Sequence, residues 1–152
     1  MLRVGIIGCG VIAPTHAEAY QLLAKKHHLQ LAMCCDTDAR KVRMFASRYG
    51  MEATTSYHTL LKSVDVVSIC TPHYLHVPMT IEALNQGVNT VSEKPMALNA
   101  GQAQLILEAL KTSRAQYTTC FQNRFNQSSL RLKSLIQEKK LGHLRGVRAV
   151  VT

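Results

Sequence analysis

Short apolar runs alternate with amphipathic stretches along the first 120 residues, a pattern that predicts β-α units and a parallel sheet. A run such as Val66 and Val67 suits a strand that is buried on both faces. The pattern predicts strands at 2–7, 29–35, 52–54, 66–70, 88–92 and 116–121. It predicts helices at 13–26, 39–49, 57–61, 76–86 and 100–113, the last with Asn99 as its N-cap. The predicted fold class is α/β, a doubly wound parallel sheet.

The pattern changes after Cys120. Asn126 is placed to cap a helix that runs to about residue 140, and Gly142 would end it. Residues 146–152 then read as a single strand without a partner, as if they opened a second sheet. We therefore expect two parts, a nucleotide-binding domain over 1–122 and, over 123–152, the connecting helix and first strand of a second, truncated α/β domain.

Composition is that of one ordinary globular domain, since 47% of the 152 residues are hydrophobic. No run approaches the roughly 18 to 20 apolar residues that span a membrane, and the apolar start lacks a cleavage site, so neither a membrane segment nor a signal peptide is expected. The five cysteines form no C-x-x-C pair, and the seven histidines lack zinc-finger spacing. Reduced thiols, a cytoplasmic location and no metal site are expected.

The formal net charge of +9 is unevenly distributed. Residues 1–110 hold nine Lys or Arg and eight Asp or Glu, whereas residues 111–152 hold nine Lys or Arg and Glu138 alone. The basic residues of this second stretch are spread out and lack the interleaved aromatic side chains of a single-strand binding surface. An ordinary solvated or partner-facing surface is favoured over nucleic-acid binding.

The first strand ends in a glycine turn with a recognisable spacing. Gly8, Gly10 and Ala13 form a G-x-G-x-x-A motif that opens a helix. Gly8 permits the tight turn, Gly10 lets the backbone approach a pyrophosphate, and Ala13 allows the helix to pack closely on the strand. The free N–H groups and the positive dipole end of the helix would then hold the phosphates. Small residues also serve tight strand-helix turns without a ligand, and that alternative stays open.

Asp36 ends the second strand, 23 residues beyond Ala13. A carboxylate there can accept hydrogen bonds from the adenosine ribose and repels a 2′-phosphate, which favours NAD over NADP. Arg40 follows closely and could stack on adenine or bind that phosphate, so NADP stays an alternative. Asp36 could instead form an Asx turn or cap the next helix.

Two later strands also end in polar residues, where ligands of parallel sheets bind. The first turn runs Thr71-Pro72-His73-Tyr74-Leu75-His76, and the second runs Ser92-Glu93-Lys94-Pro95. With the glycine turn and the run 121–125 (Phe-Gln-Asn-Arg-Phe), in this order and spacing, the whole chain resembles the glucose-fructose oxidoreductase, inositol dehydrogenase and rhizopine catabolism protein family. The Glu-Lys-Pro triplet is the most specific element of this resemblance.

The resemblance implies a Rossmann domain that binds NAD(P) and roles for individual residues. Lys94 would reach the substrate hydroxyl, and the Lys-Pro bond, often cis in the family, would aim it into the groove. Asn123 and Arg124 would border the nicotinamide or the substrate. Family members usually have Asn where this chain has His73. The expected cofactor-binding residues are Gly8, Gly10, Val11 and Ile12 at the pyrophosphate, Asp36 at the ribose with Arg40 beside it, Thr71, His73 and His76 along the groove, and Glu93 and Lys94 by the nicotinamide ribose.

The chemistry of alcohol oxidation fits a lysine, because a partly desolvated amine can assist proton loss as hydride leaves for the nicotinamide. Lys94 could instead be a solvated surface charge, and His73 and His76 could be helix-start residues without a ligand. The family also uses an Asp and a His of its second domain. We therefore expect the chain to bind nucleotide, to be inactive alone on its sugar or polyol substrate, and to form a homo-oligomer or pair with a partner that carries the missing domain.

A non-catalytic module for sensing or assembly, which binds nucleotide without turnover, is the alternative function.

Overall fold

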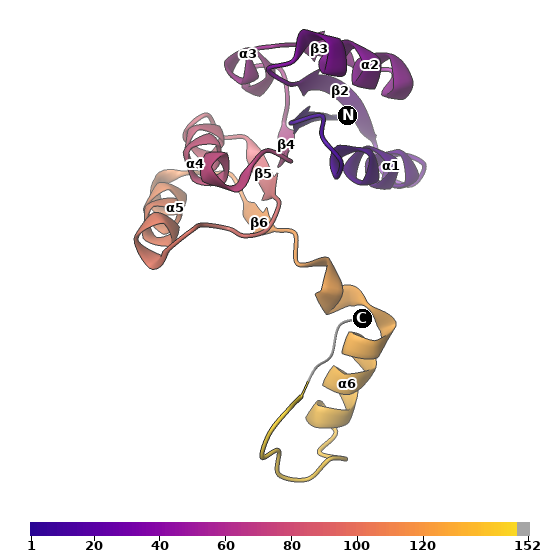
Figure 1. Ribbon diagram of the computed structural model, residues 1–152, viewed down its shortest axis with the longest axis vertical. Helices are drawn as coiled ribbons and strands as arrows, with labels where there is room; N and C mark the ends of the chain where they lie inside the picture. Colours follow the sequence, from indigo (N-terminus) through magenta and orange to yellow (C-terminus); the bar gives the residue numbers. More distant parts are fainter. Residues whose placement is uncertain (149–152) are drawn as a thin grey trace. The chain divides into compact units, whose positions relative to one another are not determined.

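The computed structural model describes residues 1–148, and its centre is a six-stranded parallel sheet (Figure 1). The strand order is β3-β2-β1-β4-β5-β6, with every neighbouring pair parallel. The strands are β1 (Leu2–Ile7), β2 (Leu29–Cys35), β3 (Glu52–Thr54), β4 (Val66–Ile69), β5 (Asn89–Ser92) and β6 (Tyr117–Thr119).

Helices cover both faces of this sheet. Val4 and Ile6 of β1 pack with α1 and α2, whereas Ile7 packs in a second core with α3 and α4. Successive strand residues point to opposite faces, so this apolar strand needs a helical layer on each side. A third cluster joins α4 to α5. The helices are α1 (Ala13–Ala24), α2 (Ala39–Tyr49), α3 (Tyr57–Leu61), α4 (His76–Asn85), α5 (Ala100–Thr112) and α6 (Gln127–Gln137), with short 3-10 turns η1 (His73–Leu75) and η2 (Gln122–Phe125).

The sheet changes direction between β1 and β4. The chain first builds outward on one side of β1, through β2 to β3, and then returns to place β4 on the other side of β1. The loops that leave the carboxyl ends of β1 and β4 therefore diverge to opposite faces, and a crevice opens between them. This arrangement is the predicted doubly wound α/β fold, which is confirmed.

The predicted elements of the sheet are all present, with ends that differ by two residues at most. Asn99 caps α5 as expected, its side chain accepting a hydrogen bond from the backbone N–H of Gln102. The predicted end of the last helix is wrong. Helix α6 ends at Gln137, because Lys139 already has a left-handed backbone (φ 55°) and cannot continue the helix to Gly142. Asn126 occupies the N-cap position without a capping side-chain bond.

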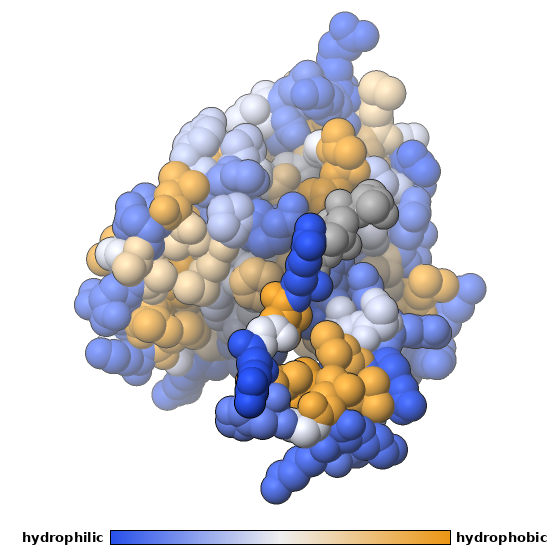
Figure 2. Space-filling model, turned by 60° about the horizontal axis from the view of Figure 1, so that its bottom comes forward, coloured by the Kyte–Doolittle hydropathy of each residue, from blue (hydrophilic) through white to orange (hydrophobic). Residues whose placement is uncertain are grey.

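The chain divides into two compact units, residues 1–120 and 121–152. In the second unit α6 has no buried residue. Figure 2, in which the bottom of Figure 1 comes forward, shows apolar side chains gathered on α6 and the segment after it. The predicted strand at 146–152 lies mostly outside the described residues, and residues 146–148 form no strand. Among residues 1–148, no helix is long and apolar enough to cross a membrane.

Candidate functional site

A cavity of about 390 Å³ opens at the crevice between the ends of β1 and β4. It brings together the ends of three strands, since Gly8 follows β1, Asp36 follows β2 and Thr71 follows β4. Its remaining wall is largely apolar and aromatic. The residues around the cavity are Ile7, Gly8, Gly10, Cys35, Asp36, Thr37, Lys41, Thr55, Tyr57, Cys70, Thr71, Pro72, Tyr74, Leu75 and Met79.

The glycine turn forms the floor of this cavity, and its two glycines serve different purposes. Gly8 has a φ of 90°, and a Cβ placed there would lie 2.7 Å from the carbonyl oxygen of Cys70, so no larger residue fits. A Cβ on Gly10 would meet nothing within 4 Å, so the backbone at Gly10 faces open space. No side chain caps the start of α1. Within residues 1–148, the backbone N–H groups of Gly10, Val11 and Ile12 donate no hydrogen bond, so these three donors are free for an anion.

Asp36 is fixed against the glycine turn by its own hydrogen bonds. Its Oδ2 accepts the backbone N–H of Cys9 at 2.8 Å, and its Oδ1 accepts that of Asp38 at 2.9 Å. Asp38, and not Asp36, caps α2 by accepting from the backbone of Arg40 and Lys41. The Asx-type bond is thus present. Each carboxylate oxygen can accept two hydrogen bonds, so both retain a free lone pair for a ligand hydroxyl.

Other residues predicted at the cofactor site have different positions. Thr71 lines the cavity, as do Gly8, Gly10 and Asp36. Val11 is fully exposed at the glycine turn, Ile12 packs partly against the core, and the Arg40 side chain is exposed. Sequence reasoning missed Lys41, Tyr57 and Tyr74 in the cavity wall. Lys41 lies one residue after Arg40 in the first turn of α2, a helix start that Asp38 marks in the sequence.

His76 and His73 stand at helix starts, and only His76 is buried. The His76 side chain is completely covered, and its ring nitrogens lie 2.8 Å from the carbonyl oxygen of Pro95 and 2.9 Å from that of Thr71. The ring therefore connects the turn after β4 to the turn after β5, and it is not among the cavity-lining residues. His73 is exposed at the start of η1, its ring edge-on to His76 at 5.6 Å.

Replacing His76 with alanine should lower the free energy of unfolding by about 2–4 kcal/mol, because it leaves a cavity and removes the ring N–H from the carbonyls of Thr71 and Pro95. Urea denaturation of the purified chain measures this change. His73→Ala is the matched control. Since its side chain is exposed, it should shift stability by no more than about 0.5 kcal/mol. Equal losses in the two variants would contradict the connecting role of His76.

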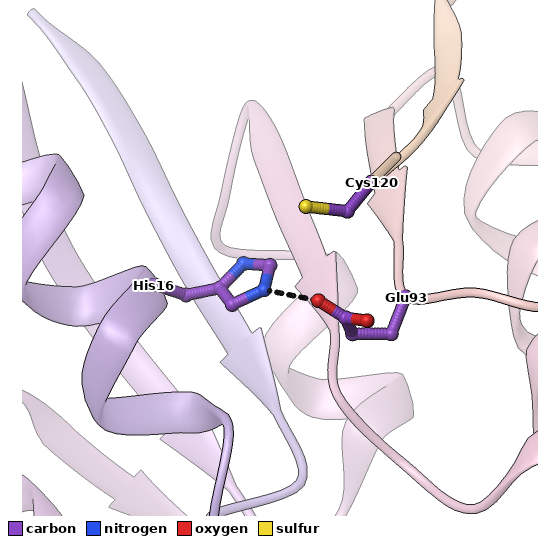
Figure 3. Close-up of side chains that lie close together, drawn as sticks. All are labelled: His16, Glu93 and Cys120. Carbon is purple, nitrogen blue, oxygen red and sulfur yellow. Dashed lines mark hydrogen bonds and ion pairs between the residues drawn. The ribbon is translucent and has the colours of Figure 1, made fainter. Parts of the chain in front are cut away.

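Lys94 follows β5 and joins Pro95 through a cis peptide bond, as the resemblance implies. Its side chain is exposed, whereas Glu93 before it is buried. One oxygen of Glu93 accepts the backbone N–H of Lys94 at 3.2 Å, and the other lies 3.0 Å from Nε2 of His16 on α1 (Figure 3). Burial raises the pKa of Glu93, but the hydrogen bonds from His16 and Lys94 outweigh it and hold this pKa below its usual value.

His16 is a residue of this site that sequence reasoning missed. It is buried on α1, and Ala13, Ala17 and Tyr20 share its helical stripe, a spacing that marks an inward-facing side. Cys120 completes a cluster in which one ligand atom each from His16, Glu93 and Cys120 lies within 4.8 Å of the others. Burial and the nearby Glu93 charge raise the pKa of Cys120 above its usual value.

Asn123 and Arg124, predicted at the substrate side, belong to the second unit. Both lie in η2 and are exposed.

Comparison with known proteins gives a consistent picture. Residues 2–121 match the model of a family described as an oxidoreductase family with an NAD-binding Rossmann fold. The chain is 31% identical to "Oxidoreductase P35" of Formosa agariphila over 143 residues, which are 92% of this chain and 44% of that protein. It is 28% identical to inositol 2-dehydrogenase of Salmonella typhimurium over 93% of this chain and 43% of that protein.

Among solved structures, the WlbA dehydrogenase of Bordetella pertussis, in complex with NADH and UDP-GlcNAcA, superposes with a TM-score of 0.87 at 26% identity. The match covers 93% of this chain and 43% of that one. The chain thus spans less than half the length of these relatives. Since the family model matches most of the chain, the protein belongs to the glucose-fructose oxidoreductase, inositol dehydrogenase and rhizopine catabolism protein family, whose members share an NAD-binding Rossmann fold.

Proposed function

We propose that the chain binds NAD(H) in the cavity between β1 and β4 and forms the cofactor half of a sugar or polyol dehydrogenase. The observation that carries this proposal is the meeting of Gly8, Gly10 and Asp36 around one cavity at the point where the strand order reverses. The uncapped start of α1 and the open space at Gly10 suit a pyrophosphate. Asp36 has free lone pairs for the ribose hydroxyls.

The remaining assignments follow the path of a dinucleotide from this turn. Val11 and Ile12 join the glycines at the pyrophosphate, Arg40 and the newly found Lys41 flank the adenosine, and Thr71 lies midway along the groove. His73 borders the groove from the surface, and His76 supports it from beneath. Lys94 and Glu93 lie at the carboxyl end of β5, where the nicotinamide ribose would extend.

The proposed reaction is the oxidation of a secondary alcohol of a sugar or polyol, or its reverse. The nicotinamide, when bound, supplies the hydride acceptor. Lys94 would take the hydroxyl proton on its Nζ as the hydride leaves. Asn123 and Arg124 would contact the substrate. A dehydrogenase named for inositol and one solved with NADH and a nucleotide sugar are among the relatives of this chain, which supports this substrate class.

Calorimetric titration of the purified chain with NAD, NADH, NADP and NADPH tests the proposal. NADH and NAD should bind about 10-fold more tightly than their phosphorylated counterparts, because the Asp36 carboxylate repels a 2′-phosphate. Binding of NADPH with equal affinity would contradict the assignment of Asp36. Failure of all four dinucleotides to bind would reject the nucleotide site altogether.

We also propose that another polypeptide covers the second unit, either a second copy of this chain or a partner that carries the substrate-binding half. Six large apolar side chains on α6 and after it are between 39% and 73% exposed, more apolar surface than one short helix usually leaves uncovered. They are Leu130, Leu132, Ile136, Leu141, Leu144 and Val147.

We place the boundary between the two domains at residues 122 and 123. We also place the protein in the cytoplasm, because its five free thiols are compatible with a reducing compartment.

A further inference from the structure

Buried polar side chains form a hydrogen-bond network that connects α1 with β4 and with the turn after β5. The His16 Nε2 lies 3.0 Å from Glu93 Oε1, and its Nδ1 lies 3.2 Å from the hydroxyl of Ser68 on β4. The same hydroxyl lies 2.9 Å from the hydroxyl of Tyr20. His16, Ser68 and Glu93 are all less than 9% exposed. Such a network within an apolar core is costly unless every member has a partner, and here each one does.

The partners determine where the protons lie. Glu93 is ionised at neutral pH, because its pKa lies below the usual value, and an ionised carboxylate only accepts hydrogen bonds. Nε2 of His16 must therefore carry a hydrogen and donate it to Glu93. With a neutral ring, Nδ1 accepts from Ser68, and Ser68 accepts from Tyr20. All donors then point the same way, from Tyr20 toward Glu93.

The second oxygen of Glu93 continues the line to the proposed base. It accepts the backbone N–H of Lys94 at 3.2 Å, so one carboxylate joins His16 to the backbone from which the Lys94 side chain extends. We propose that His16 is a positioning residue for Lys94, acting through Glu93. This inference rests on the role proposed above for Lys94.

A metal ion held by His16, Glu93 and Cys120 is the competing explanation for this cluster. A zinc ion would lie about 2.0–2.2 Å from the nitrogen and oxygen ligands and about 2.3 Å from the sulfur, and it would need the lone pair of His16 Nε2. In the structure that nitrogen lies at hydrogen-bond distance from the carboxylate, and a nitrogen that donates to Glu93 has no lone pair left for an ion. The geometry thus favours direct contact over a shared ion.

Two amide variants separate the two sides of the His16 ring. The side-chain nitrogen of His16→Gln can fall near Nε2 and keep the bond to Glu93, whereas the shorter His16→Asn reaches only the position of Nδ1 and keeps the bond to Ser68. Both variants are neutral and polar, so a general loss of packing affects both. Only the positioning role predicts that the glutamine variant keeps the wild-type reactivity of Lys94 while the asparagine variant does not.

The measurement is the rate at which Lys94 in the 152-residue chain reacts with trinitrobenzenesulfonate, read from its peptide by mass spectrometry. We expect His16→Asn to change this rate by at least about threefold and to raise the pKa of Glu93 in a carbon-13 NMR titration, with His16→Gln within about twofold of wild type. Glu93→Gln should change the labelling rate as His16→Asn does. The double variant His16→Asn/Glu93→Gln should change this rate no more than either single variant, because both substitutions break the same connection. If His16→Asn does not fold, the labelling rates of Lys94 in Glu93→Gln and His16→Gln are compared instead. The inference then requires a changed rate in Glu93→Gln and a nearly wild-type rate in His16→Gln.

Equal effects of the asparagine and glutamine variants would overturn the inference, since they would make His16 a packing residue. So would zinc binding by the wild type that both variants abolish. NADH titration of the same samples keeps the proposed function separate. A wild type that binds no NADH contradicts that function, while the labelling rates still decide whether His16 positions Lys94.

Discussion

Gly8→Ala should destabilise the chain by about 2–4 kcal/mol and abolish NADH binding. Gly8 has a φ of 90°, which costs a residue with a Cβ about 1–2 kcal/mol. The new methyl group would also lie 2.7 Å from the Cys70 carbonyl oxygen, and the backbone cannot give way easily there. Gly8 and Cys70 donate backbone hydrogen bonds to Cys35 and Ile7, which hold the ends of β1, β2 and β4 together. Urea denaturation and NADH titration measure the two losses.

Gly10→Ala is the matched control, with the same substitution two residues away. Its Cβ would meet nothing within 4 Å, so stability should stay within about 0.5 kcal/mol of wild type. NADH affinity should nevertheless fall at least about 10-fold, because the methyl group would occupy the space proposed for the pyrophosphate. Wild-type affinity in this variant would show that the phosphates bind elsewhere. Wild-type stability in Gly8→Ala would contradict the structure of the turn itself.

Asp36→Ala should weaken NADH binding about 10- to 100-fold, because hydrogen bonds from hydroxyls to a carboxylate contribute about 1.5–3 kcal/mol. NADPH should lose little or gain affinity, since the variant removes the charge that repels a 2′-phosphate and leaves Arg40 and Lys41 beside the site. The ratio of the two dissociation constants, measured by calorimetry, is therefore the informative quantity, because a general loss of structure would lower both affinities together.

Asp38→Ala tests whether the effect belongs to this carboxylate. Asp38 is two residues away and caps α2, so the variant should lower stability while it leaves the NADH to NADPH ratio unchanged. A ratio that shifts equally in both variants would assign cofactor choice to the start of α2. An unchanged ratio in Asp36→Ala would remove Asp36 from the adenosine site.

The candidate site was predictable where it depends on local sequence. The structure brings Gly8, Gly10, Asp36 and Thr71 to one cavity, because parallel strands bring their carboxyl ends to one edge, while their roles toward a cofactor stay predictions. Lys41, Tyr57 and Tyr74 were missed. Their side chains reach the cavity from α2, α3 and η1, and their orientation depends on how those elements pack on the sheet.

The contacts of His16 and His76 were even less predictable from local sequence. The helical stripe of α1 predicts that His16 faces inward, but not what it meets there. Its partner Glu93 lies 77 residues away, at the end of a strand that is separated from β1 by β4. His76 was read as part of the groove, yet its ring binds the carbonyls of Thr71 and Pro95 inside the protein. The contacts of both histidines join segments that come together only when the sheet and its helices pack.

The sequence by itself determined the alternation of strands and helices, the glycine turn and the acidic end of β2, because periodic burial and the freedom of glycine act over a few residues. Only the tertiary structure decided the strand order that opens the cavity. It also decided the connection from His16 through Glu93 to Lys94. These features depend on which distant segments lie side by side, and that choice is made by the packing of the whole core, which no single stretch of sequence contains.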